Sequence, residues 1–221
     1  MKSGLLRNVV LAALAVCVLG AGVASADVTY TVDSSALTLG YMNVFDLSNN
    51  FLWGSGWGTA DLTAVWSGNQ LTLGPNCIGD PNEYWYLPSG GPGSVGQKLM
   101  EANLYTQVDD GSLAGQKVTF RGEVLSNTLT SAHVAVAFVK DFAADWGSYQ
   151  IAVVNLPTSG LFTVSLNTIN DPSRHVQWGF QMKGVCVWVT DLAPYGTAVV
   201  GPTSVVPTAS KTWGALKSLY R

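Results

Sequence analysis

Two aromatic clusters are the residues in this sequence whose type and spacing best suit binding chemistry. Two Trp side chains flank a Gly-Ser-Gly turn and three consecutive aromatic residues follow later in the chain: Trp53 and Trp57, then Tyr84, Trp85 and Tyr86. Sugar rings pack on flat aromatic faces, while the polar tips of Tyr and Trp bond to hydroxyl groups. The clusters predict a carbohydrate-binding platform. The alternative is core filling, because an alternating Tyr-Trp-Tyr strand buries at least one ring.

Oxygen-bearing side chains crowd into two other segments. They are Asn76, Asp80, Asn82 and Glu83 in one segment, and Asp141 and Asp145 in the other. Calcium is held by several such oxygens together with backbone carbonyls. A structural calcium ion is therefore the one cofactor that the sequence suggests, although Asx turns explain the same residues without a metal.

The first 26 residues have the pattern of a secretory signal peptide. Lys2 and Arg7 precede an apolar run over 9–23, and Ala24-Ser25-Ala26 supplies the small residues that signal peptidase recognises. The apolar run is shorter than the roughly 20 residues that a membrane span needs. We expect residues 1–26 to be removed and the protein to be secreted or held at the cell surface, with no membrane span.

Two cysteines, Cys77 and Cys186, remain after that cleavage. An exported protein meets oxidising conditions, and an even count permits one bridge, so we expect a disulfide between them. The alternative is two buried thiols, since spacing along the chain does not supply the short Cα–Cα distance that a disulfide requires.

No arrangement of residues in the sequence identifies an active site. Glu83 and Glu123 could be the two acids of a glycosidase, which must flank the scissile bond. The only histidines are His133 and His175, and neither a nucleophile elbow nor a set of zinc ligands accompanies them. We therefore expect a non-catalytic protein and keep a glycan-active hydrolase as the alternative.

Composition and charge exclude several classes of protein. Apolar residues make up 48% of the 221 residues and charged residues 11%, which excludes a wholly disordered chain. Residues 27–210 carry six basic and 14 acidic side chains, net −8. A body without a basic stripe is unsuited to nucleic acid and to an anionic membrane surface.

Hydrophobic alternation indicates an all-β fold. In one run Val118, Phe120 and Val124 share a face while charged residues take the other face. About ten such runs, separated by Gly, Pro, Asn and Asp, predict an antiparallel β-sandwich over 27–200, jelly-roll-like in its connections. The segment 97–105 fits either a short helix or a strand.

The end of the chain differs in composition from the body. Residues 201–210 are rich in Pro, Ser and Thr, which predicts a linker. Residues 211–221 form a short basic amphipathic tail, in which Trp213, Leu216 and Tyr220 share one helical face and Lys217 and Arg221 lie elsewhere. We expect a signal that sorting machinery reads; the alternative is a frayed terminus.

Residues 40 to about 202 resemble secreted bacterial β-sandwich proteins that are often associated with PEP-CTERM sorting and are similar to carbohydrate-binding-module jelly rolls. The motifs that carry the resemblance are Gly40-Tyr-Met-Asn-Val-Phe45, Trp57-Gly-Thr-Ala-Asp-Leu62, Leu71-Thr-Leu-Gly-Pro-Asn76, Ile78-Gly-Asp-Pro81, Tyr84-Trp-Tyr86, Gly90-Gly-Pro-Gly93, Ser126-Asn-Thr-Leu-Thr130 and Val187-Trp-Val-Thr-Asp-Leu-Ala-Pro194. The tail departs from that family, whose members end in Pro-Glu-Pro, an apolar helix and an Arg cluster.

Together these patterns predict an exported, non-catalytic β-sandwich that binds polysaccharide or serves as a cell-surface or extracellular matrix component. Besides the hydrolase, one other class stays open: a structural subunit that assembles through its sheet edges.

Overall fold

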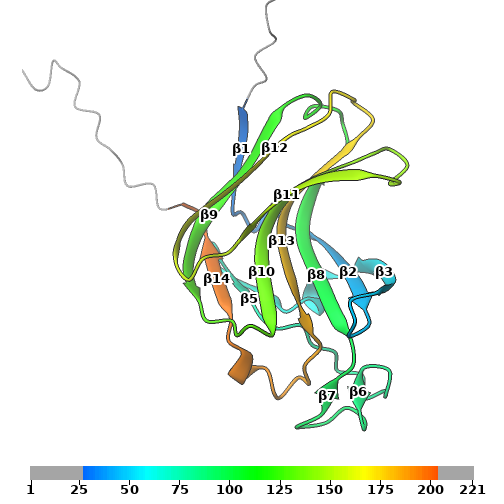
Figure 1. Ribbon diagram of the computed structural model, residues 1–221. Helices are drawn as coiled ribbons and strands as arrows, with labels where there is room; N and C mark the ends of the chain where they lie inside the picture. Colours follow the sequence, from blue (N-terminus) through cyan, green and yellow to red (C-terminus); the bar gives the residue numbers. More distant parts are fainter. Residues whose placement is uncertain (1–26, 204–221) are drawn as a thin grey trace, which may run out of the picture.

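Two β-sheets pack against each other in the computed structural model, which describes residues 27–203 (Figure 1). The first sheet follows the order β1–β9–β14–β5–β4, and β12 also pairs with β9. Its strands are β1 (Asp27–Thr31), β4 (Ala64–Ser67), β5 (Gln70–Leu73), β9 (Lys117–Asn127), β12 (Gly160–Asn167) and β14 (Ala198–Gly201).

The second sheet follows the order β11–β10–β13–β8–β2–β3. Its strands are β2 (Leu39–Phe45), β3 (Phe51–Trp57), β8 (Leu99–Val108), β10 (His133–Phe142), β11 (Tyr149–Asn155) and β13 (His175–Val185). Long central strands run through the middle of this sheet, so it offers an extended surface with β11 and β3 at its two edges.

Three small elements complete the described chain. The strands β6 (Tyr86–Leu87) and β7 (Val95–Gly96) form a separate two-stranded sheet, which projects beyond the end of β8 in Figure 1. The 3₁₀ turns η1 (Thr59–Asp61) and η2 (Ala193–Tyr195) lie in connections. Within residues 27–203, no helix has the length and apolar character to cross a bilayer.

The predicted all-β sandwich of antiparallel sheets is confirmed, with one exception in the pairing. Strand β1 runs parallel to β9, whereas the other paired strands of the two large sheets are antiparallel. The jelly-roll connectivity stays a prediction. Gly201, the first residue of the predicted linker, ends β14 instead. The predicted signal peptide over 1–26 and the tail over 211–221 lie outside the described residues.

Aromatic side chains from both sheets fill the space between them. In β9 the alternation found in the sequence is observed, since Val118, Phe120 and Val124 are buried. Phe120 contacts Phe162 of β12 and Phe180 of β13 edge to face, with ring centroids 5.5 and 5.2 Å apart. Burial of such rings is a main source of stability in a sandwich.

Candidate functional site

The second sheet has an inner face that packs on the first sheet and an outer face that turns away from it. Met42, Ala102 and Met182 stand opposite one another on the inner face and are buried. Their chain neighbours therefore project to the other side, because successive side chains of a strand alternate. The outer face, as used below, comprises Tyr41, Asn43, Phe45, Phe51, Glu101, Asn103, Tyr105, Gln107, Phe138, Lys140, Phe142, Tyr149, Ile151, His175, Gln177, Gln181 and Lys183.

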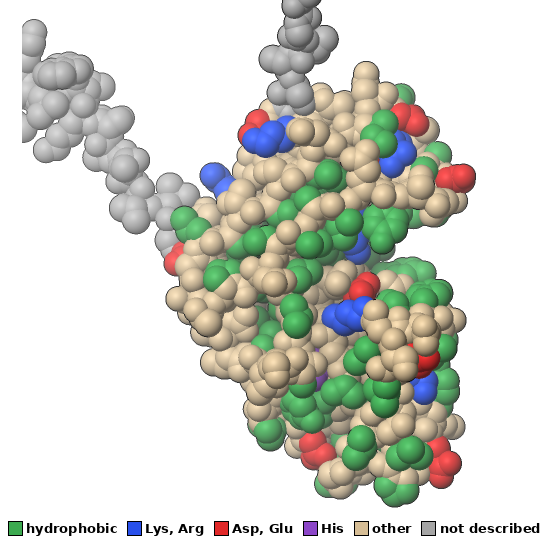
Figure 2. Space-filling view, in the orientation of Figure 1, with side chains coloured by type: hydrophobic (Ala, Val, Ile, Leu, Met, Phe, Trp, Pro, Cys, Tyr) green, Lys and Arg blue, Asp and Glu red, His purple; other side chains and the backbone are tan. Residues whose placement is uncertain are grey.

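The middle of the outer face is polar, and several of its polar side chains are buried although they lie outside the core. Asn103, Gln177 and Lys140 are only 3%, 6% and 8% exposed. Figure 2 shows this side of the molecule hollowed below the β10–β11 hairpin. A polar side chain withdrawn from water must find partners to offset its desolvation. Hydrogen-bonding side chains therefore form the middle of the outer face.

Hydrogen bonds across the strands hold these polar side chains in place. The Nζ of Lys140 donates to Oδ1 of Asn103 at 2.9 Å, and Nε2 of Gln177 donates to Oε1 of Gln107 at 2.6 Å. The Nδ2 of Asn103 donates to the backbone carbonyl of Glu101 at 3.1 Å. Side chains fixed in this way offer their remaining donors and acceptors in a set geometry, which favours specific recognition.

An aromatic group closes one end of the outer face, at the β10–β11 hairpin. Trp146 stacks on His175, with centroids 4.2 Å apart and ring planes 6° apart, and Phe142 lies 5.0 Å from Tyr149. Trp146 and Tyr149 are 50% and 56% exposed. Nδ1 of His175 lies 2.7 Å from Oδ1 of Asp109, which fixes the imidazole beneath the indole. A non-Gly residue rarely adopts the φ of +60° found at Trp146.

A second aromatic group lies at the opposite end, on the β2–β3 edge. The rings of Phe45 and Phe51 meet edge to face with centroids 5.7 Å apart, and Phe51 is 60% exposed. Nζ of Lys183 lies over the Phe45 ring at 3.9 Å and 3.5 Å from Glu101 Oε2, and Nδ2 of Asn43 donates to the other oxygen of that carboxylate. From one end to the other β13 spans about 33 Å, which separates the two aromatic groups.

Lys140 is the unusual charged group of the outer face. Its ammonium lies 4.1 Å from the centroid of the buried Phe138 ring, besides bonding to Asn103. Burial lowers the pKa of Lys140 from its ordinary value near 10.5 to about 8, and the charge of Glu101 opposes part of that effect.

This shifted pKa makes the stability of the protein depend on pH. Between about pH 8 and 10.5 the unfolded chain holds the Lys140 proton and the folded chain has released it, so stability rises with pH. We expect the free energy of unfolding to gain about 2 kcal/mol from this group between pH 7 and pH 9.5. Urea unfolding of the wild type and of Lys140→Met gives the unfolding free energy of each protein across that pH range. The gain is the difference between the two curves of unfolding free energy against pH. Curves that run parallel would contradict the lowered pKa of Lys140.

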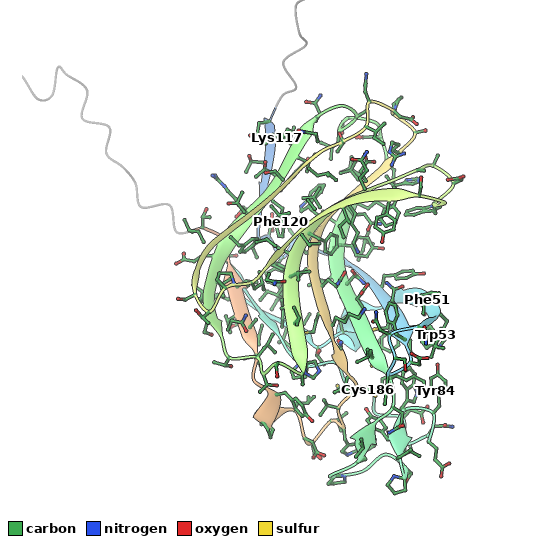
Figure 3. The ribbon with its side chains drawn as sticks, viewed as in Figure 1. Phe51, Trp53, Tyr84, Lys117, Phe120 and Cys186 are labelled. Carbon is green, nitrogen blue, oxygen red and sulfur yellow. The ribbon has the colours of Figure 1, made fainter. Side chains whose placement is uncertain are left out.

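The predicted aromatic platform is placed mainly on the inner side of the sheet and in the core. Trp53 stands opposite the buried Val44, while Trp85 and Tyr86 are buried. Nε1 of Trp53 donates to the Tyr84 hydroxyl at 2.8 Å, and the planes of Trp53 and Trp85 are 78° apart. Figure 3 shows Phe51, Trp53 and Tyr84 following one another from the β3 edge of the second sheet toward the small β6–β7 sheet. Trp85 and Tyr86 therefore serve packing and offer no open ring face.

Trp57 takes a different position from the other predicted platform residues. It lines an open pocket of about 450 Å³ together with Gly56, Gly58, Asp61, Cys77, Ile78 and Gly79. Its Nε1 donates to Oγ of Ser55 at 3.1 Å. Trp57 thus lines a concave surface, and this surface is separate from the outer face.

The predicted disulfide is wrong: Cys77 and Cys186 are free thiols. Cys77 pairs with Val187 in an isolated parallel bridge. Cys186 precedes Val187 and so points to the opposite side, where its Sγ donates to the Trp85 carbonyl at 3.1 Å. Burial raises the pKa of both thiols, which lowers their reactivity.

The predicted calcium ligands are not gathered into one site. Residues 27–203 contain no group of three or more His, Cys, Asp or Glu side chains that could hold a metal ion. Asp80 and Asn82 accept backbone N–H groups two residues on, as does Asp145, which is Asx-turn geometry. Asp141 is fully buried and bonds to Arg174.

The remaining two predicted ligands follow the same pattern. Asn76 is buried and donates to the carbonyls of Met100 and Met182, whereas Glu83 is exposed in the turn that precedes β6. Neither side chain is joined by a second carboxylate in a metal-binding group of the described chain. The calcium prediction therefore gains no support from this geometry.

The residues of the outer face were missed in the sequence because they come from six strands. One signal was available: Asp145-Trp146-Gly147 is a turn sequence that holds a Trp, and a turn exposes its side chains. His175 lies beneath the Trp146 ring and supports it. Neither a scan against protein-family models nor a search of curated proteins finds a match for this chain.

Proposed function

We propose that this protein is an exported, non-catalytic carbohydrate-binding β-sandwich that holds an extended polysaccharide along the outer face of its second sheet. The observation that carries the proposal is the combination of ordered, buried polar side chains in the middle of that face with exposed aromatic rings at both ends. Carbohydrates need both elements, because their hydroxyl groups seek hydrogen bonds and their C–H faces pack on rings. The ligand would come from the cell surface or its surrounding matrix.

Binding rather than hydrolysis is favoured by the acids of this face. Among the outer-face strand residues that the structure describes, Glu101 is the one with a carboxylate. Lys183 and Asn43 both bind that carboxylate. Glycoside hydrolysis ordinarily uses two carboxyl groups flanking the scissile bond. The geometry thus supplies contacts for a sugar chain without the second acid that the hydrolase alternative needs.

Substitution of Tyr149 tests the proposal. We expect Tyr149→Ala to weaken polysaccharide binding about fivefold to tenfold, since one ring contact contributes about 1 kcal/mol. Affinity electrophoresis through a panel of soluble polysaccharides identifies a ligand, and titration calorimetry then gives its dissociation constant. Tyr84→Ala is the matched control, because Tyr84 is also an exposed Tyr but lies outside the outer face.

Together with a third variant, Trp57→Ala, this pair distinguishes the outer face from the other aromatic surfaces. Binding that survives Tyr149→Ala but is lost in Trp57→Ala would move the site to the pocket beside η1. Binding that is lost in Tyr84→Ala would move it to the β3 edge. Absence of binding to every polysaccharide in the panel would overturn the proposal.

A second candidate function rests on strand β11. It pairs with β10 and forms an edge of the second sheet, and its seven residues include no charge and no proline. Such an edge can accept a strand from another copy, so self-assembly into a structural layer is the alternative. A sedimentation experiment that finds only monomer over a wide concentration range would remove it.

A further inference from the structure

We propose that Lys140 selects glycans that carry an anionic group, a uronate carboxylate or a sulfate ester, by donating hydrogen bonds to that group in the hollow of the outer face. This inference rests on the proposed polysaccharide binding and names the class of ligand. It depends on the contacts of one ammonium group and on the charges around it.

The ammonium of Lys140 has donors left over. An ammonium carries three N–H groups, and the Oδ1 of Asn103 is the one hydrogen-bond acceptor that the described part of the chain gives them. The Phe138 ring interacts with the cation without accepting a conventional hydrogen bond. Lys140 is nevertheless more than nine-tenths buried. A buried cation with unmet donors is costly to the fold, and an anion bound there would remove that cost.

No carboxylate of the described chain forms a direct ion pair with Lys140, although the charge of Glu101 acts on it from a distance. Glu101 is the nearest acid on the face, but its carboxylate is engaged by Lys183 and Asn43. Lys140, Lys183 and Glu101 are the charged side chains at the strand positions of the outer face, which sum to +1. The whole described chain has six basic and 14 acidic residues. The protein as a whole is acidic and does not attract polyanions in general. The single excess positive charge on the outer face therefore favours an anion at that place.

The remaining groups that face Lys140 are neutral. Its cross-strand neighbours are Ile151 of β11 and Gln177 of β13, and Gln177 bonds to Gln107 of β8. These amides and the Asn103 side chain can bond to the hydroxyl groups on either side of the anionic substituent. The hollow therefore has the components for one acidic sugar held between polar contacts.

The test compares polymers that share a backbone and differ in whether they carry the anionic group. Polygalacturonate, alginate and hyaluronan are each measured by calorimetry beside their carboxyl-reduced forms, and dextran sulfate is measured beside dextran. We expect at least one anionic polymer to bind tenfold or more tightly than its neutral counterpart. Preference within a uronate pair identifies a carboxylate, and preference within the dextran pair identifies a sulfate.

Lys140→Met should abolish that preference: the variant is expected to bind the anionic polymer no more tightly than its neutral counterpart. Lys117→Met is the matched control: it removes the same charge from β9 in the other sheet, where Lys117 pairs with Asp27 at the surface. If both variants weaken anionic binding equally, the effect is general electrostatics and the inference fails. If the wild type binds neutral and anionic forms alike, the inference fails while the proposed function stands.

A measurement on the wild type keeps the test independent of folding of the variant. Because the pKa of Lys140 is about 8 in the free protein, affinity for the anionic polymer should fall as pH rises from 7 to 9.5. The other titratable groups of this face are Glu101, Lys183, the His175–Asp109 pair and the tyrosines, and burial raises the pKa of Tyr105. Affinity for the neutral polymer should not change. An anionic affinity that is constant across this range would overturn the inference.

Discussion

Replacing Asp141 by Ala is expected to lower the free energy of unfolding by about 3 to 5 kcal/mol, because it leaves a largely buried guanidinium without its partner. Asp141 is fully buried near the end of β10, and its Oδ1 accepts from Nε of Arg174 at 2.7 Å. Its Oδ2 accepts from the backbone N–H of Ile169 at 2.8 Å, and its carbonyl accepts from Arg174 Nη2. One carboxylate thus ties β10 to the β12–β13 connection.

Thermal or urea unfolding checks this prediction. For a domain of this size the loss corresponds to a fall in melting temperature of roughly 6 to 20 °C. Asp109→Ala is the control, since the Asp109 side chain is 52% exposed where it contacts His175 and exposed pairs contribute about 1 kcal/mol or less. Equal losses of unfolding free energy in the two variants would mean that the buried Asp141–Arg174 pair contributes no more to stability than an exposed contact.

Replacing Phe180 by Ala is expected to cost about 3 to 5 kcal/mol as well, through lost burial and the cavity that remains. Phe180 is fully buried between the sheets and packs on Phe120 and Phe162, with centroids 5.2 and 5.7 Å apart. The same side-chain deletion at the exposed Phe51 should cost less than about 1 kcal/mol, because its ring is already largely in water. Urea midpoints of the two variants, at unchanged slope, give the comparison.

The Phe180→Ala variant also tests whether the proposed binding site lies on the outer face. Phe180 projects to the inner face, whereas its neighbours Gly179 and Gln181 lie on the outer face. A Phe180→Ala protein that keeps polysaccharide affinity at temperatures where it is folded would show that the core and the binding face contribute separately. Loss of affinity in the folded variant would contradict the placement of the site on a rigid sheet.

Local sequence patterns were enough to predict the class of fold and the two-sided character of its strands. Val118, Phe120 and Val124 alternate with polar residues, and the structure buries those three on the inner side of β9. This succeeded because alternation is a local property of a strand with one face in the core. The segment 97–105 stayed ambiguous locally, and pairing with both β13 and β2 made it the strand β8.

The pairing of the strands in three dimensions set which face of each strand points outward and where each cysteine side chain points. Trp53 and Trp57 share a face because they are four residues apart in β3, but the pairing of β3 with β2 turns that face inward. Cys77 and Cys186 come to adjacent segments, yet the register with Val187 points the second thiol away from the first.

The polar cluster in the middle of the outer face depends on strand order in the same way. Asn103, Lys140 and Gln177 are unremarkable polar residues on three different strands, and only the order β10–β13–β8 brings them together. The physical reason is common to all these cases. Propensity and period depend on neighbours within a few residues, whereas sheet order and register depend on contacts between residues far apart in the chain, and these contacts set the burial and charge of a site.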